Sequence, residues 1–346
     1  MHSVGKPTLT PILTIVQKDK LNYIEQMIRK QHLFEKEGIT MKTLVYGAGV
    51  LGSYLAHVLI QGGNDVTMLA RGSRAEELKR DGLVIRHYFQ RRTTTDRVTV
   101  ISTLEPEEHY DLIFVVMKFN DFPAVLPVLA VNTSSNIVLV GNNPEAHATQ
   151  RILEELSGNK KNIAFGFQLS GGRREKDRMI SVRAGGQMVL GALNGPVPFQ
   201  DMLATAFAHT KYKLSFLEDI DTWLKSHIIT ILPMNLATFA VKGDVKILAK
   251  NKKLLQQIIT AMDEGFSVLE TLGYTIVPAG QVKAVRSYRR LMYLFLKLYH
   301  RLPVARMIDG SVHELTALNS AFERLKQQAG VATPVWDELV ALNGER

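Results

Sequence analysis

The spacing of hydrophobic positions divides the chain into two parts near residue 217. From residue 41 to 216, short continuous apolar runs alternate with segments whose apolar positions recur at helical spacing. This alternation predicts a parallel, doubly wound sheet, because strands covered by helices on both faces are apolar throughout. The expected strands are Thr43–Tyr46, Asp65–Leu69, Leu83–Ile85, Val98–Ile101, Leu112–Met117, Ile137–Val140 and Ile163–Phe165.

The end of this first part and the whole of the second follow other patterns. Met179–Leu190, which contains Gly185 and Gly186, is predicted to form a β-ribbon. Phe199–His209 is predicted to be a helix, and Tyr212–Leu217 a last extended segment. The helices expected after residue 217 are Leu224–Val241, Val245–Leu272, Ala279–Arg301 and Val312–Gly330. We therefore predict an α/β domain at 41–216 and an all-α C-terminal domain at 217–346.

Residues 1–40 precede the first expected strand and are unlike the rest of the α/β pattern. Pro7 and Pro11 interrupt the opening, and Leu21–Glu37 is predicted to be a short amphipathic helix that ends at Gly38. Two readings are open for this extension, an artefact of an upstream start and a docking arm, and we favour the first.

Composition narrows the class of protein. Hydrophobic residues make up 46% of the chain and charged residues 22%, as in soluble globular proteins. No apolar run approaches the ~20 residues that span a bilayer, and Lys18–Lys20 interrupt any signal-peptide core, so we expect a cytoplasmic protein without a membrane partner. The absence of cysteine excludes disulfides and thiolate sites, and the histidines lack metal-ligand spacing. The net charge of +9 is scattered without a nucleic-acid motif, which argues against a nucleic-acid partner.

The first candidate site is the glycine pattern Gly47-x-Gly49-x-x-Gly52, between the strand Thr43–Tyr46 and a helical segment. Glycine permits the tight turn, the close approach of backbone to a pyrophosphate and the packing of helix on strand. The first helical N–H groups and the helix dipole then face the anion. This context predicts a Rossmann-type dinucleotide-binding domain whose cradle is Gly47, Ala48, Gly49, Val50, Leu51 and Gly52.

The residue after the second strand indicates which dinucleotide binds. An NAD-binding domain commonly has an acidic residue there, whereas this chain has Arg71, with Ser73 and Arg74 close behind. A guanidinium binds a 2′-phosphate through paired, charge-assisted hydrogen bonds. We therefore expect NADP(H), held by Arg71 with help from Arg74 or Ser73.

Four polar residues lie where a parallel sheet or a helical domain could bring them to a ligand. Lys118 and Asn142 each follow an expected strand at its carboxyl end, where open sheets bind ligands. Lys225 is a candidate proton donor for a carbonyl reduction, although periodicity alone favours an exposed helix charge. Glu314 could receive the product hydroxyl or position the lysine, or serve only as a first-turn helix carboxylate.

From residue 41 onward these motifs resemble the ketopantoate reductase (2-dehydropantoate 2-reductase) family. The resemblance rests on the glycine cradle, on Arg71 and Lys118, and on a set of short motifs. Those motifs are Gly141-Asn142-Asn143, Trp223-Leu224-Lys225, Glu314-Leu315-Thr316-Ala317-Leu318-Asn319-Ser320 and Gly330-Val331-Ala332-Thr333-Pro334-Val335. It implies that Lys118 and Asn142 contact the cofactor, and that Lys225, Asn142 and Glu314 act in catalysis.

The chain departs from the family in the residues that bind substrate. The family has asparagines four and eight residues after the lysine, where this chain has Ile229 and Pro233. The family's serine about a dozen residues before the glutamate falls near Leu302-Pro303, and Ser311 is too close to Glu314 to replace it. The resemblance thus implies NADPH-dependent reduction of a 2-keto acid, such as 2-dehydropantoate to pantoate in pantothenate biosynthesis. A different keto substrate and a non-catalytic NADPH sensor remain alternatives.

One further stretch, Ala284–Arg301, is basic, aromatic and apolar at once. A core helix or a contact in a homodimer is favoured there over a membrane-surface helix. Its arginines and lysines are also candidates to replace the missing carboxylate anchors.

Overall fold

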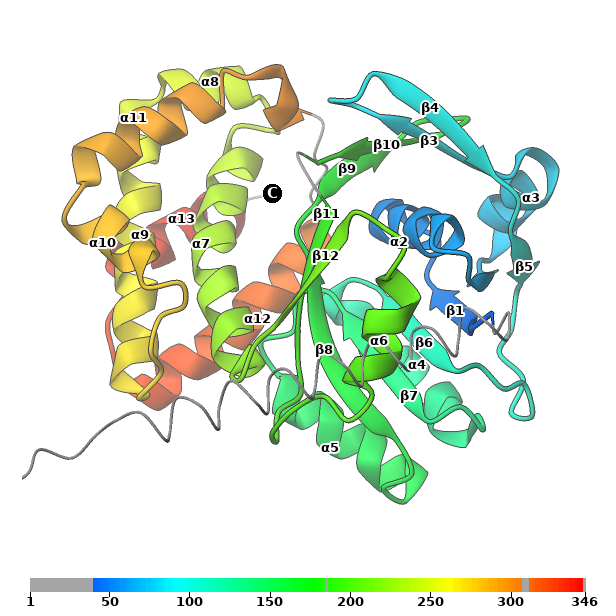
Figure 1. The fold of residues 1–346 in the computed structure, drawn as a ribbon. Helices are drawn as coiled ribbons and strands as arrows, with labels where there is room; N and C mark the ends of the chain where they lie inside the picture. Colours follow the sequence, from blue (N-terminus) through cyan, green and yellow to red (C-terminus); the bar gives the residue numbers. More distant parts are fainter. Residues whose placement is uncertain (1–39, 184–185, 307–310, 345–346) are drawn as a thin grey trace, which may run out of the picture.

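The computed structural model describes residues 40–183, 186–306 and 311–344 (Figure 1). The helix expected at Leu21–Glu37, and the extension 1–40 except its last residue, lie outside the described residues. A mixed α/β part with a large sheet is followed by a helical part, drawn from yellow-green to red in Figure 1. The predicted fold class is confirmed.

The large sheet has eight strands in the order β12-β11-β8-β7-β6-β1-β2-β5. Neighbouring strands are parallel except β11 and β8, which are antiparallel. The strands are β1 (Lys42–Tyr46), β2 (Asp65–Leu69), β5 (Thr99–Ile101), β6 (Leu112–Val116), β7 (Asn136–Val140), β8 (Asn162–Gln168), β11 (Gly186–Gly191) and β12 (Tyr212–Phe216). This strand order reverses direction between β1 and β6, so the carboxyl ends of these two strands border a crevice suited to a ligand.

Helices cover both faces of the large sheet, which explains the continuous apolar runs. Along β6, Leu112, Phe114 and Val116 pack with α2, α3 and α6, whereas Ile113 and Val115 pack with α4 and α5 on the other face. These helices are α2 (Val50–Gln61), α3 (Gly72–Asp81), α4 (Phe122–Val131), α5 (Ala146–Ser157) and α6 (Gln200–Phe207). Side chains alternate between the faces of a strand, so a strand buried on both sides has no polar position.

A second sheet of four strands, in the order β4-β3-β10-β9, corrects two expectations. Its strands are β3 (Leu83–His87), β4 (Arg92–Asp96), β9 (Gly171–Arg174) and β10 (Met179–Val182). The expected strand Leu83–Ile85 therefore lies outside the doubly wound sheet. The expected ribbon Met179–Leu190 is wrong as well, because β10 pairs with β9 and β3 while β11 pairs with β8 and β12.

The helical part contains more helices than the periodicity predicts, because the expected helices Val245–Leu272 and Ala279–Arg301 are each divided in two. The helices are α7 (Ile220–Ala240), α8 (Val245–Lys250), α9 (Lys252–Thr271), α10 (Gly280–Arg286), α11 (Arg289–Tyr299), α12 (Val312–Ala329) and α13 (Pro334–Gly344). The side chain of Asn251 accepts a hydrogen bond from Leu254 N and caps α9, which separates α9 from α8 within the expected helix Val245–Leu272. Among the described residues, no helix is long and apolar enough to cross a membrane.

The core of the helical part lies between α7, α9 and α13, and α11 lies at its edge (Figure 1). In α11 only Leu296 is buried, while Leu291, Leu294, Phe295 and Leu298 are each more than half exposed. The expectation of a core helix is therefore wrong for α11, because its apolar stripe faces away from α9.

Candidate active site

A cleft of about 950 Å³ opens between the carboxyl ends of the central strands and the helices α7 and α12. Almost every candidate from the sequence lines it: the glycine cradle Gly47–Gly52, Arg71, Lys118, Asn142 and Glu314. Lys225 does not. Asn142 and Glu314, which are 172 positions apart in the chain, thus both line this cleft. The sheet edge forms one side of the cleft and α12 the other.

Two glycines of the cradle, Gly47 and Gly52, are required by close packing, and the third, Gly49, leaves space for a ligand. A Cβ on Gly47 would lie 2.2 Å from Val116 O, and one on Gly52 would lie 1.9 Å from Gly47 O, so larger residues cannot fit at either position. Gly47 also has a φ of +123°, which disfavours other residues. Gly49 has open space where its Cβ would be, and it precedes the first turn of α2, which holds no acidic residue. These residues fit a dinucleotide pyrophosphate.

Arg71 follows β2 at its carboxyl end and lines the cleft. Its Nη2 donates to the hydroxyl of Tyr46 at 3.1 Å, and its Nε donates to Ser102 O at 3.4 Å. The side chain is exposed and carries its charge at the edge of the cleft next to the second strand. A cation at this place can bind an anion on the ribose of a dinucleotide.

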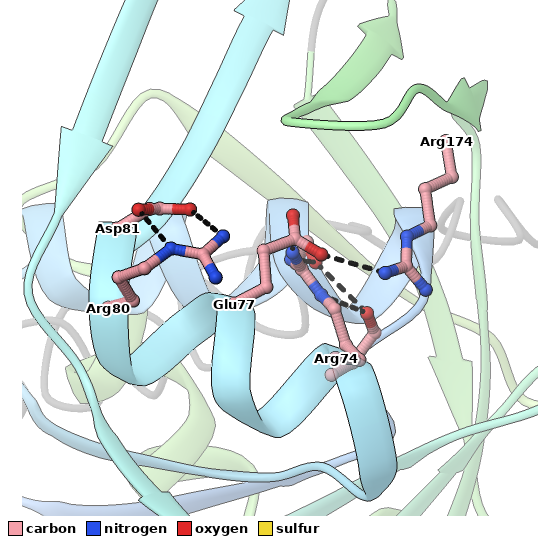
Figure 2. Close-up of polar contacts among 7 residues, drawn as sticks. Arg74, Glu77, Arg80, Asp81 and Arg174 are labelled. Carbon is pink, nitrogen blue, oxygen red and sulfur yellow. Dashed lines mark hydrogen bonds and ion pairs between the residues drawn. The ribbon is translucent and has the colours of Figure 1, made fainter.

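Arg74 lines the cleft too, but its guanidinium is occupied within the protein (Figure 2). Nη1 forms an ion pair with Glu77 at 2.6 Å, Nη2 donates to Ser53 Oγ at 3.0 Å, and Nε donates to Ala48 O at 3.2 Å. Burial lowers the pKa of Arg74 from its ordinary value, against the opposing charge of Glu77. Arg74 therefore fixes α3 to the cradle. The sequence predicts that Arg74 or Ser73 helps Arg71. The Arg74 guanidinium is already occupied by these contacts, and Ser73 does not line the cleft.

Asn142 lines the cleft, two residues beyond Val140 of β7. Lys118 stands two residues beyond Val116 of β6, and these two valines are paired in the sheet. Asn142 Nδ2 donates to Glu314 Oε1 at 3.1 Å. Its Oδ1 is buried and has no hydrogen-bond partner among the described residues. A buried acceptor without a partner is unfavourable, so this oxygen is available to a ligand donor.

Glu314 reaches the cleft from the first turn of α12. The side chain of Ser311 caps this helix by accepting a hydrogen bond from Glu314 N at 3.4 Å. A carboxylate in the first turn is favoured by the helix dipole, but this one also receives the hydrogen bond from Asn142. Stabilising the helix terminus does not require the contact with Asn142, so Glu314 does more than stabilise α12.

The helix α7 turns Lys225 away from the cleft, which corrects the expected place of this residue. Lys225 is 4% exposed, its Nζ forms an ion pair with Asp221, and it lies 5.0 Å from the centre of the Tyr274 ring. Asp221 and Tyr274 line a separate cavity of about 430 Å³. The motif Trp223-Leu224-Lys225 resembles that of the family, but the motif does not determine which face of the helix the lysine occupies.

The face of α7 that lines the cleft consists of Ile231, Asn235 and Phe239. Residues four apart share a helix face, whereas Lys225, Ile229 and Pro233 follow a different stripe, and Ile229 packs on Gly265 of α9. The positions compared with the family's asparagines are thus not the cleft positions. Sequence reasoning missed Asn235, although its spacing from Ile231 and Phe239 was available.

His227 lies one turn before Ile231 on the same stripe. Its ring lies 4.2 Å from the Phe167 ring, which lines the cleft, and stacks on Trp223 at 4.9 Å. Burial lowers the pKa of His227 to about 4, so the imidazole is neutral at neutral pH. The His227 ring packs beside Phe167 and does not itself line the cleft.

The strand β9 supplies a further part of the cleft that the sequence did not reveal. Ser170, Gly171, Gly172, Arg173 and Arg174 line the cleft, and a Cβ on Gly172 would lie 2.8 Å from the Val50 side chain of the cradle. This strand has no apolar run, so its pattern carries no strand signal.

Comparison with known proteins finds a family match for part of the chain. Residues 43–195 match the family described as ketopantoate reductase PanE/ApbA. The chain is 26% identical over 246 residues to 2-dehydropantoate 2-reductase of Archaeoglobus fulgidus, which covers 70% of this chain and 78% of that protein. A short match to the uncharacterized oxidoreductase YkpB of Bacillus subtilis is 58% identical over 45 residues, 13% of this chain and 15% of that protein.

Solved structures share the fold at low identity. The 2-dehydropantoate 2-reductase of Geobacter metallireducens GS-15 superposes with a TM-score of 0.71 at 17% identity, covering 88% of this chain and 99% of that one. A D-mandelate dehydrogenase, solved with NADH and anilino(oxo)acetate, gives 0.70 at 18% identity, covering 88% and 98%. The family match spans the glycine cradle, Lys118 and Asn142, and the shared fold extends into the helical part. Residues 43–195 of this chain therefore match the ketopantoate reductase (PanE/ApbA) family, and the chain as a whole is similar in fold to solved 2-dehydropantoate 2-reductases.

Proposed function

We propose that this protein is an NADPH-dependent reductase of a 2-keto acid or a related small carbonyl compound, similar to 2-dehydropantoate 2-reductase. The arrangement at Asn142 carries the proposal. Its Nδ2 is engaged by Glu314 while its buried Oδ1 lacks a partner among the described residues. A ligand held between the glycine cradle and α12 would supply that missing donor.

A nicotinamide cofactor is supported by the cradle and by the family. The D-mandelate dehydrogenase that shares this fold was solved with NADH. For the present chain, Arg71 and the absence of an acidic residue after β2 favour NADP(H) over NAD(H). When bound, the nicotinamide would supply the hydride.

The protein's own residues then have distinct roles. Asn142 orients cofactor and substrate, and Glu314 fixes the Asn142 amide through the 3.1 Å hydrogen bond and accepts from the product hydroxyl. The reduction also needs a positive group near the carbonyl oxygen, where charge develops. Lys225 was expected to fill that role, but its ammonium is held by Asp221 outside the cleft. Lys118 is the only lysine among the described residues that line the cleft, and we assign the role to it.

The decisive experiment is an NADPH-consumption screen of the purified protein over branched and linear 2-keto acids, including 2-dehydropantoate. Consumption with at least one compound is expected, together with a strong loss of turnover in Lys118→Met. Tight NADPH binding without consumption across the panel would overturn the reductase and support the sensor.

A further inference from the structure

The two walls of the cleft differ in charge. Every arginine and lysine that lines it belongs to the sheet side: Arg71, Arg74, Lys118, Arg173 and Arg174. The described residues of the helical wall, which come from α7 and α12, include no cation and one carboxylate, Glu314. Arg74, Arg173 and Arg174 already pair with carboxylates, and Asp121 also lines the sheet side, so Lys118 and Arg71 are the sheet-side cations that can attract a substrate carboxylate. Glu314 on the helical wall would repel it.

The helical wall is instead apolar. Ile231 and Phe239 of α7 are only partly buried, and Leu315 and Leu318 of α12 lie beside them in the lining. Phe167 of β8, also partly buried, extends this surface from the sheet side. Asn235 is the one neutral amide that α7 contributes to the lining. Such a surface gains most by contact with an apolar group, because burial removes its exposed carbon atoms from water.

The basic residues of 284–301 do not change this picture. Arg286 forms ion pairs with Asp263 and Glu270, and Arg289 forms one with Asp263, on the outside of α9. Neither arginine lines the cleft, so the suggestion that this stretch replaces the carboxylate anchors is not supported for them.

We infer that the substrate is a 2-keto acid with an apolar side chain, branched aliphatic or aromatic, bound in one orientation. The inference rests on the proposed function and names its substrate class. The carboxylate faces Lys118 and the sheet edge, and the apolar side chain packs on Phe167, Ile231 and Phe239. A hydroxyl on the substrate side chain would be buried against this apolar wall, which is unfavourable unless the hydroxyl is hydrogen-bonded. Asn235 is the one neutral amide that α7 contributes to this wall.

The test compares kcat/KM for four 2-keto acids that share the reacting group: pyruvate, 4-methyl-2-oxopentanoate, phenylglyoxylate and 2-dehydropantoate. We expect the two apolar compounds to exceed pyruvate by about tenfold or more, since each methylene in an apolar pocket adds roughly tenfold. We also expect the better of them to exceed 2-dehydropantoate.

Two variants of the wall and one control complete the experiment. Phe239→Ala and Ile231→Asn should each lower the ratio of apolar substrate to pyruvate by about tenfold. Phe295→Ala removes an aromatic ring that is 57% exposed on α11 and should leave the ratio unchanged. NADPH binding and the thermal midpoint show that each variant is folded.

The outcomes separate the inference from the function on which it rests. Absence of NADPH consumption with every compound counts against the reductase itself. Turnover that is equal across the panel, highest with 2-dehydropantoate, or insensitive to both wall variants overturns the substrate class and leaves the reductase standing.

Discussion

Asn142 and Glu314 are joined by a hydrogen bond of 3.1 Å between Nδ2 and Oε1, although one follows β7 and the other begins α12. This bond fixes which end of the amide faces the carboxylate, since only the NH₂ group can donate to it. The carbonyl end of Asn142 is thereby kept free as an acceptor, which is the state that a ligand N–H or O–H requires.

We therefore expect Asn142→Ala to lower kcat/KM for carbonyl reduction by about 10²-fold, the usual effect of removing one positioned polar group. Steady-state kinetics with the best substrate of the screen measures it. Asn136→Ala, at the opposite end of β7 where the amide bonds Asp111 O, is the matched control and should keep its activity. Equal losses in both variants would indicate damage to the strand.

Lys225→Met should lower the free energy of unfolding rather than act directly on catalysis. Among the described residues, it leaves the buried Asp221 with only the exposed His147, 3.7 Å away, and breaking one side of a buried ion pair costs about 3–5 kcal/mol. Urea unfolding measures the change. Lys326→Met removes an ion pair with the half-exposed Asp337 and should cost less than about 1 kcal/mol. A Lys225→Met protein of normal stability that lacks turnover would return Lys225 to the reaction.

Arg71→Ala should weaken NADPH binding by about 10²-fold with little effect on NADH, because only NADPH carries the 2′-phosphate that the guanidinium can pair with. Fluorescence titration with both cofactors gives the ratio. Arg80→Ala is the control on the same helix, since Arg80 pairs with Asp81 and does not line the cleft (Figure 2). An unchanged ratio in Arg71→Ala would argue against the proposed preference.

The glycine cradle offers a matched pair of variants. Gly52→Ala places a Cβ 1.9 Å from Gly47 O and should destabilise the fold by more than about 2 kcal/mol. Gly49 has a φ of −71° and open space at its Cβ position, so Gly49→Ala should fold normally yet weaken binding of the dinucleotide. Thermal unfolding and cofactor titration separate the two effects. Normal cofactor affinity in Gly49→Ala would show that no ligand occupies that space.

Acid should destabilise the protein through two histidines. Burial lowers the pKa of His87 to about 4, with the neighbouring His57 as the next cause, and burial lowers the pKa of His227 to about 4. The unfolded chain binds these protons near pH 6.5, so the neutral rings contribute stability above that pH. Stability is lost as the pH falls from 6.5 towards 4, by roughly 3 kcal/mol for each histidine at the end of this range.

Urea unfolding at pH 7.5, 6 and 5 measures this slope. His87→Asn should flatten it, whereas the exposed His109→Asn should not. A slope that is the same in all three proteins would assign the acid sensitivity to other groups.

How far the sequence predicts this molecule depends on what each residue contacts. Leu112–Val116 was recognisable as a strand because helices bury both its faces, and the glycine cradle because sterics leave few alternatives at Gly47 and Gly52. The strands β4 and β9 were not recognisable, because their residues are largely polar or glycine and the strands form through pairing with distant partners.

The site was predictable to the same degree. Lys118 and Asn142 follow buried strands, and strand direction places them in the cleft. The structure places Lys225 outside this cleft, which the sequence motif could not show, because a helix turns about 100° per residue and a shift of two positions moves a side chain to the opposite face. Only tertiary packing shows that α7 presents Asn235 to the cleft and Lys225 to Asp221. The boundary near residue 217 and the roles of the site residues remain predictions.

The carboxylate of Glu77 has a consequence for how the cleft recognises an anion. It accepts from Arg74 with one oxygen at 2.6 Å and from Arg174 with the other at 2.7 Å, while Arg173 pairs with Glu175. Of the four arginines that line the cleft, three already have a carboxylate counterion. Within the described part of the chain, Arg71 is the one guanidinium of the four whose charge is unmatched, so the proposed selectivity for a 2′-phosphate would rest on a single side chain.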